Sequence, residues 1–158
     1  MNVQLTWRGG MAFDATARGH VVTIDSRSPV GADGGQSPKE LLLASIGGCT
    51  AMDVAGILRK ARQKPTRIDV RVEADLPSGP HPRVFTRANL TFVVDGEVEV
   101  ATVVEAVRAS QTLYCGVTAM LSRAFPIHYD VIVNGANAAS GQADFGSVPT
   151  ASTSPDGT

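Results

Sequence analysis

The sequence predicts an α+β fold in which one long, buried helix packs against curved antiparallel sheets. Within residues 36–65, the run from Leu41 to Leu58 is apolar or small except for Asp53, and a helix that is apolar on every face is a buried one. Short segments of alternating apolar and polar residues flank this run and indicate antiparallel strands. Because a chain of 158 residues forms one core of ordinary size, we expect a single domain over residues 1–135.

Both ends of the central helix are marked in the sequence. Ser37 is suited to the N-cap and Pro38 to the first helical position, and Glu40 completes a capping box with Ser37. Basic residues precede Pro65, which stops the helix. The capping box and the polar residues inside the run argue against a membrane span.

The other elements follow from their apolar periodicity. Strands that alternate between tight glycine turns indicate an N-terminal meander. After the central helix, the pattern predicts two strands, two shorter helices and a last strand. The segments are residues 3–7, 11–17 and 20–25 for the meander, and residues 68–75, 84–94, 100–107, 117–124 and 127–133 for the rest.

The C-terminal residues 136–158 differ in composition from the rest of the chain. They are rich in Gly, Ala, Ser and Thr, and Phe145 is their one aromatic residue. Such a segment buries too little apolar surface to offset the entropy lost on ordering. We therefore expect residues 136–158 to be a disordered tail that packs on nothing.

Charge and cysteine content limit the class of protein. The net charge of −1 gives no reason to expect nucleic acid or an anionic membrane as a partner. The N-terminus lacks the pattern of a secretory signal, so we expect a cytoplasmic protein. In that compartment a pair of cysteines is more often catalytic or redox-active than a structural disulfide.

The two cysteines stand in different local settings. Cys49 lies in the middle of the central helix, directly after Gly47 and Gly48. The two glycines indicate either close helix packing or the approach of a substrate or a second backbone to the sulfur. Apolar burial makes Cys49 a poor nucleophile unless a cation is brought to it. Cys115 stands at the start of the last helix, where backbone N–H groups favour a thiolate, so local physics predicts that Cys115 is the more acidic thiol.

The remaining motifs give few candidates for chemistry. Among the cations on loops and strands, Arg18 is favoured because it stands at a tight turn beside Gly19. The three histidines have no ligand spacing to each other or to the cysteines, so we expect no metal site. Phosphate loops and dinucleotide fingerprints are absent from the sequence, so we expect no bound cofactor. The cations on loops and strands that could lie near a thiolate are Arg8, Arg18, Arg27, Arg83 and Arg87.

Two segments resemble a known family. SPKELLLASIGGCTAMDV, residues 37–54, is similar to the cysteine-bearing central helix of the osmotically inducible protein C family, which includes the organic hydroperoxide resistance proteins. ASQTLYCGVTAMLSRAFPI, residues 109–127, is similar to the second cysteine segment of that family. The order of elements also matches over residues 3–134. HPRVFTRANLTFVVDG, residues 81–96, most resembles a small, poorly defined bacterial branch of the family.

The resemblance implies an intertwined homodimer with active sites at its interface, and a thiol-dependent peroxidase that reduces organic hydroperoxides in defence against oxidative stress. Cys49 would attack the peroxide and become a sulfenic acid, and Cys115 would resolve it as a disulfide that a dithiol then reduces. No metal or cofactor is implied. Arg18 lies about where the family brings an arginine to the first thiolate. This assignment reverses the order of reactivity that local physics predicts for the two cysteines.

One position departs from the family pattern. Well-characterised members carry a glutamate directly after the proline that starts the helix, and this glutamate holds the arginine. Here the position is Lys39, and Glu40 follows it. Two other functions stay open: a non-enzymatic binder of small apolar or electrophilic molecules with a slow cysteine, and a structural dimer whose cysteines are core residues.

Overall fold

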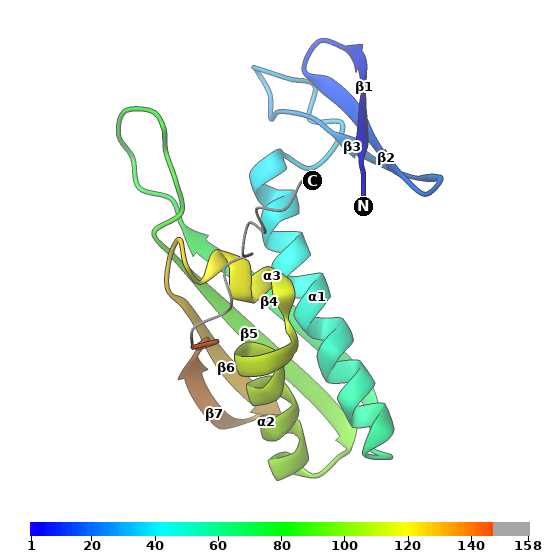
Figure 1. The fold of residues 1–158 in the computed structure, drawn as a ribbon, viewed down its shortest axis with the longest axis vertical. Coiled ribbons are helices and arrows are strands. Elements are labelled where there is room, and N and C mark those ends of the chain that lie inside the picture. Colours follow the sequence, from blue (N-terminus) through cyan, green and yellow to red (C-terminus); the bar gives the residue numbers. More distant parts are fainter. Residues whose placement is uncertain (147–158) are drawn as a thin grey trace, which may run out of the picture. The chain divides into compact units, whose positions relative to one another are not determined.

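The computed structural model describes residues 1–146, and the chain divides into two compact units (Figure 1). The first unit is residues 1–45, and the described part of the second is residues 46–146. The boundary lies inside the central helix, where the sequence predicted one domain over residues 1–135. The division arises because the three strands of the N-terminal meander form a sheet of their own.

The N-terminal unit contains the expected meander, formed by β1 (Gln4–Gly9), β2 (Ala12–Ala17) and β3 (His20–Ile24). The strands pair antiparallel in the order β1-β2-β3. Arg18 and Gly19 join β2 to β3 with φ angles of 52° and 82°, the left-handed backbone that tight hairpins require. Among the described residues of these three strands, none is buried.

The central helix α1 (Pro38–Lys60) begins at the predicted capping box. The backbone N–H and the hydroxyl of Ser37 each donate to Glu40 Oε2 at 2.8 Å. By length and composition alone α1 could cross a membrane, a test that the core helix of a soluble protein also passes. Its buried residues form one stripe, while Met52 is 77% exposed. Burial on every face, as the sequence predicted, is therefore not achieved within one chain.

The C-terminal unit is a four-stranded sheet with helices on one face. Its strands are β4 (Lys64–Asp75), β5 (Arg87–Glu97), β6 (Ile127–Val133) and β7 (Ala136–Gln142), in that order. The chain between β5 and β6 forms α2 (Val100–Ala109), a turn of π-helix η1 (Ser110–Tyr114) and α3 (Gly116–Leu121).

The α+β fold class is confirmed, but one strand pairing differs from the antiparallel sheets that the sequence predicted. β5 and β6 run parallel, whereas β4 with β5 and β6 with β7 are antiparallel. The physical reason is the helical connection between β5 and β6, which carries the chain back to the starting end of the sheet. The same connection places α2 and α3 close to the sheet.

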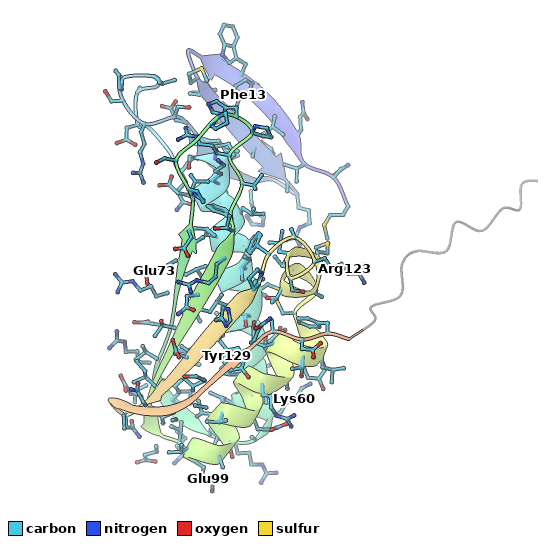
Figure 2. The ribbon with its side chains drawn as sticks, turned by 90° about the vertical axis from the view of Figure 1, so that its left-hand side faces the viewer. Phe13, Lys60, Glu73, Glu99, Arg123 and Tyr129 are labelled. Carbon is cyan, nitrogen blue, oxygen red and sulfur yellow. The ribbon has the colours of Figure 1, made fainter. Side chains whose placement is uncertain are left out.

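The core lies between this sheet and its helices. Figures 1 and 2 show α2 and the C-terminal part of α1 on one face of the sheet, and Tyr129 marks β6 in Figure 2. Alternate residues of β5 and β6 point to this face, as the period of two requires. The buried residues include Ile46, Val54 and Leu58 of α1, Val103 and Val107 of α2, Leu90, Phe92 and Val94 of β5, and Ile127, Val131 and Val133 of β6.

The prediction of a disordered tail over residues 136–158 is wrong for its first part. Residues 136–142 form β7, which pairs with β6, and Ala143 is buried in the core while Phe145 packs against it. Asn134 and Gly135 have φ angles of 49° and 80°, so they form the Asn-Gly hairpin turn that the low apolar content concealed. Residues 147–158 lie outside the described part of the chain.

Candidate active site

The two cysteines come together in the C-terminal unit. Cys49 lies in the middle of α1, and Cys115 caps the N-terminus of α3, and both are free thiols. Their Sγ atoms and a carboxylate oxygen of Asp53 all lie within 4.8 Å of one another. The connection from β5 to β6 produces this arrangement, because it returns the chain to the sheet face that α1 already covers.

The two glycines before Cys49 serve different purposes. A Cβ atom on Gly47 would lie 3.0 Å from Cγ2 of Val72 on β4, so the absence of a side chain permits close packing of α1 on the sheet. A Cβ atom on Gly48 would meet no described atom within 4 Å. Of the two explanations that the sequence leaves open, close packing therefore applies to Gly47, and open space beside Cys49 applies to Gly48.

The prediction that the start of α3 favours a thiolate at Cys115 is wrong. The residue does cap α3, since the backbone N–H and the hydroxyl of Thr118 donate to its Sγ at 3.4 and 3.0 Å. However, Cys115 is completely buried, and burial raises its pKa to about 11, despite the opposing effect of Thr118; the neighbouring Cys49 adds to the increase. Desolvation of a thiolate outweighs two hydrogen bonds here. At neutral pH Cys115 is therefore a protonated thiol.

The π-helical turn η1 positions Cys115. Its backbone N–H donates to the carbonyl oxygen of Ser110 at 3.0 Å, which is the wide five-residue spacing of a π-helix. Such turns occur frequently at functional sites. The π-helical turn is followed directly by extended backbone at Cys115 and then by α3. This sharp change of direction seats the sulfur beside α1.

A chain of polar side chains adjoins the sulfurs. Ser110 Oγ donates to Asp53 Oδ2 at 2.9 Å and lies 2.8 Å from Thr50 Oγ1. Gln111 Nε2 donates to Thr50 Oγ1 at 2.6 Å. Sequence reasoning assigned Asp53 no role. The signal was present, because Asp53 is the one charge in the apolar run and stands four residues after Cys49, a spacing that places both on one helix face.

The same atoms form a possible metal-binding group. Two thiol sulfurs and a carboxylate oxygen within 4.8 Å of one another make a donor set that suits Zn²⁺, with one position of a tetrahedral site left open. The sequence prediction of no metal site rested on the spacing of the histidines, none of which belongs to this group. Binding of a divalent ion would occupy both cysteines and so compete with their redox chemistry.

A pocket of about 430 Å³ lies between α1 and the segment α2–η1. Apolar side chains from both sides contribute to it, and Asp53 stands on its wall. Because Asp53 also lies within 4.8 Å of both sulfurs, the pocket adjoins the cysteine pair. The residues that line it are Met52, Asp53, Gly56, Ile57, Lys60, Glu105, Ala109 and Tyr114.

In the N-terminal unit, Glu40 pairs with an arginine other than the one that the sequence favoured. Arg27 donates to Glu40 Oε1 and forms an ion pair with it, while Arg18 occupies the turn between β2 and β3. The loop that carries Arg27 is shaped by Asp25, a buried carboxylate that accepts hydrogen bonds from backbone N–H groups of this loop. Glu40 therefore both caps α1 and holds an arginine, although Lys39 occupies the family's glutamate position.

The state of Glu40 gives a pH-dependent prediction. The backbone N–H of Ser37, then its hydroxyl, then Arg27 lower the pKa of Glu40 from 4.5 to about 2. A pKa below the unfolded value contributes stability that is complete above about pH 4.5 and is lost as the pH falls toward about 2. We expect the melting temperature of the wild type to fall more over this range than that of Glu40→Gln, as measured by circular dichroism. Equal losses in the two proteins would contradict the role of the carboxylate.

Comparison with known proteins agrees with the fold. The family model described as OsmC-like protein matches residues 31–130. Protein YhfA of Escherichia coli (strain K12) is 36% identical over 136 residues, which cover 84% of this chain and 98% of that protein. The crystal structure of a hypothetical protein from Aquifex aeolicus VF5 has a TM-score of 0.75 at 28% identity, covering 84% of this chain and 94% of that one.

A more distant structure shows likeness of fold alone. The organic hydroperoxide resistance protein OsmC from Legionella pneumophila has a TM-score of 0.57 at 14% identity, over 84% of this chain and 95% of that one. The match to the family model covers the central helix and most of the C-terminal unit, and membership of this family supports a redox or peroxide-related role. The chain belongs to the OsmC-like protein family.

Proposed function

We propose that the protein is a thiol-dependent peroxidase that reduces organic hydroperoxides by a two-cysteine mechanism. Cys49, half-buried and beside the open space at Gly48, attacks the terminal oxygen of the peroxide, releases the alcohol and becomes a sulfenic acid. Cys115 then attacks the Cys49 sulfur, and water leaves as a disulfide forms. A dithiol reductant restores both thiols. The observation that carries the proposal is the proximity of two free cysteines from separate elements, whose sulfurs lie within 4.8 Å of each other.

The environments of the two sulfurs support this division of roles. Cys115 is completely buried with a pKa raised to about 11, so it is a poor first nucleophile. A buried thiol suits the second step, in which its reaction partner is already attached to the protein. The apolar pocket of about 430 Å³ next to the pair favours hydroperoxides that carry an organic group over hydrogen peroxide.

The Cys49 thiolate also needs a positive charge. We assign this charge to an arginine from residues 1–45, either of the same chain or of a second copy. The sequence favours Arg18, and the ion pair with Glu40 favours Arg27. Replacing each with lysine separates the two: the substitution at the functional arginine slows the peroxide reaction, and the substitution at the other arginine leaves it near the wild-type rate.

A homodimer fits the exposed apolar surface of the N-terminal unit. Val3, Leu5, Trp7, Val21 and Val22 are each at least 47% exposed, and a sheet needs cover on at least one apolar face. We therefore propose the homodimer that the sequence resemblance implies, acting in the cytoplasm. Light scattering at micromolar concentration is expected to give twice the chain mass, and a stable monomer would contradict it.

One observation favours the alternative of a non-enzymatic binder. The pocket could hold a small apolar molecule without any reaction at the cysteines. The two functions differ in the fate of the bound molecule. A binder returns the ligand unchanged and keeps both thiols, whereas a peroxidase returns the alcohol and loses both thiols.

Stopped-flow measurement of thiol loss tests the proposal. The reduced protein is mixed with cumene hydroperoxide or with hydrogen peroxide, and free thiols are counted after quenching. We expect two thiols to be lost per chain with either oxidant, and a faster reaction with cumene hydroperoxide because its organic group gains apolar contacts. Retention of both thiols with both oxidants would contradict the function.

A further inference from the structure

We infer that Asp53 transfers the proton during disulfide closure: its carboxylate takes the proton from the Cys115 thiol and gives it to the oxygen that leaves Cys49. This inference rests on the proposed function and adds a third residue to the cysteine pair. It concerns the second chemical step, in which the sulfenic acid on Cys49 becomes a disulfide.

The position of Asp53 meets the geometric requirement for proton transfer. Its carboxylate oxygen lies within 4.8 Å of both sulfurs, a separation that one bridging water spans. Asp53 stands one helical turn after Cys49 on α1 and so faces the same side. A carboxylate has about four lone-pair sites, so the hydrogen bond from Ser110 Oγ at 2.9 Å leaves acceptor sites for a proton.

The hydrogen bonds around Asp53 link it to the segment that carries Cys115. Ser110 donates its hydroxyl to Asp53, and its carbonyl oxygen accepts the backbone N–H of Cys115 at 3.0 Å. Ser110 also contacts Thr50, the residue after Cys49. The carboxylate is therefore held by the same short turn that seats the resolving thiol. This arrangement preorganises the acceptor for a thiol that has to lose its proton inside the protein.

The step balances in atoms and electrons. The S–O bond of the Cys49 sulfenic acid breaks and the S–S bond forms, so the Cys49 sulfur is reduced while the Cys115 sulfur is oxidised. The proton of the Cys115 thiol moves to the carboxylate and then to the departing hydroxide, which leaves as water. No external oxidant or reductant enters this step, and Asp53 ends as the carboxylate with which it began.

The sign of the effect separates proton transfer from a purely electrostatic influence. A carboxylate beside two sulfurs disfavours a second negative charge on either of them. If Asp53 acted only through its charge, Asp53→Asn would make closure faster. If Asp53 accepts the proton, the same substitution removes the acceptor and makes closure slower. The direction of change therefore decides between the two roles.

The test resolves the two steps of the reaction in time. Reduced protein is mixed with one equivalent of cumene hydroperoxide and quenched at intervals with a dimedone-type trap, and intact mass distinguishes trapped sulfenic acid from disulfide. In Asp53→Asn we expect closure at neutral pH to be about 100-fold slower, the lower end of general acid–base effects. Trappable sulfenic acid should accumulate, and its rate of formation should be no lower than in the wild type. Asp53→Glu, which keeps a carboxylate, should restore most of the rate.

Two controls protect the interpretation. Asp130→Asn removes another half-buried carboxylate, which lies on β6 and accepts a serine hydroxyl at 2.6 Å. This substitution should leave the rate of disulfide closure unchanged. Ser110→Ala keeps the Asp53 carboxylate but removes the hydroxyl that donates to it, and should slow disulfide closure by a smaller factor. If Asp53→Asn does not fold, this variant still tests the inference.

The pH dependence supplies a readout that structural damage alone would not alter. The deficit of Asp53→Asn should shrink as the pH rises toward 11, where the Cys115 thiol ionises without help. Lys60, Glu105 and Tyr114 share the pocket wall with Asp53, and they are unchanged in both proteins. Closure in Asp53→Asn as fast as in the wild type would overturn the inference alone. Absence of any sulfenic acid in the wild type would overturn the proposed function, and this inference with it.

Discussion

Cys49→Ser is expected to abolish the reaction with cumene hydroperoxide, with a loss on the order of a thousandfold or more, the scale observed when an enzyme loses its nucleophile. Serine lacks a readily ionised group, and Cys115 cannot take over because it is completely buried with a pKa raised to about 11. Cys115→Ser should behave differently. It should consume one equivalent of peroxide per chain at near the wild-type rate and then stop, because the sulfenic acid on Cys49 has no partner.

The pair of variants also tests the competing assignment. If Cys115→Ser abolishes the first reaction while Cys49→Ser retains it, the nucleophile is Cys115 and the desolvation argument fails. Peroxide consumption is measured by loss of cumene hydroperoxide at low micromolar protein, and the double variant provides the background rate.

Deletion of residues 136–158 is expected to lower the melting temperature by roughly 10 °C, corresponding to about 3 kcal/mol in a chain of this size. The deletion removes β7 from the edge of the sheet and withdraws Ala143 and Phe145 from the core. Burying one large apolar side chain contributes about 1.5–3 kcal/mol, and each hydrogen bond of the ladder contributes about 1 kcal/mol. The edge of β6 would also become free to pair with other chains.

Deletion of residues 147–158 is the matched comparison, because it leaves all of β7 in place. Both deletions are followed by circular dichroism at the same protein concentration. Equal melting temperatures for the wild type and the deletion of residues 136–158 would show that β7 contributes nothing to stability, contrary to the pairing described above.

The sequence predicts most elements of this fold because their signals are local. The capping box of Ser37 and Glu40, the glycine turns of the meander, and the alternation in β4 and β6 each depend on neighbouring residues. The parallel pairing of β5 with β6 depends on the path of the intervening helices, which no local pattern records. β7 was not predicted because the low apolar content of residues 136–158 indicated a disordered tail, although Asn134 and Gly135 are typical hairpin-turn residues.

For the candidate site too, the sequence predicts some features, and others depend on the fold. Cys49 and Cys115 are identified from the sequence as the reactive residue type, but their proximity follows from the fold and, before it, only from the family resemblance. The prediction of a thiolate at Cys115 failed because burial is a tertiary property whose effect on the pKa of Cys115 exceeds the local effect of the α3 N-terminus. Asp53 is visible as a charge in an apolar run, yet the role inferred for it depends on its hydrogen bond from Ser110, which comes from another element.

Cys49 and Cys115 of one chain are expected to form a disulfide when an organic hydroperoxide oxidises the protein. Reduced protein is treated with one equivalent of cumene hydroperoxide, digested without reduction and examined by peptide mass spectrometry, with a heavy-isotope copy mixed in to reveal bonds between chains. We expect a cross-linked peptide pair that contains Cys49 and Cys115 from the same chain, and its loss on treatment with a dithiol. Oxidation that stops at sulfenic or sulfinic acid on Cys49, or disulfides that join different chains, would contradict the two-cysteine mechanism.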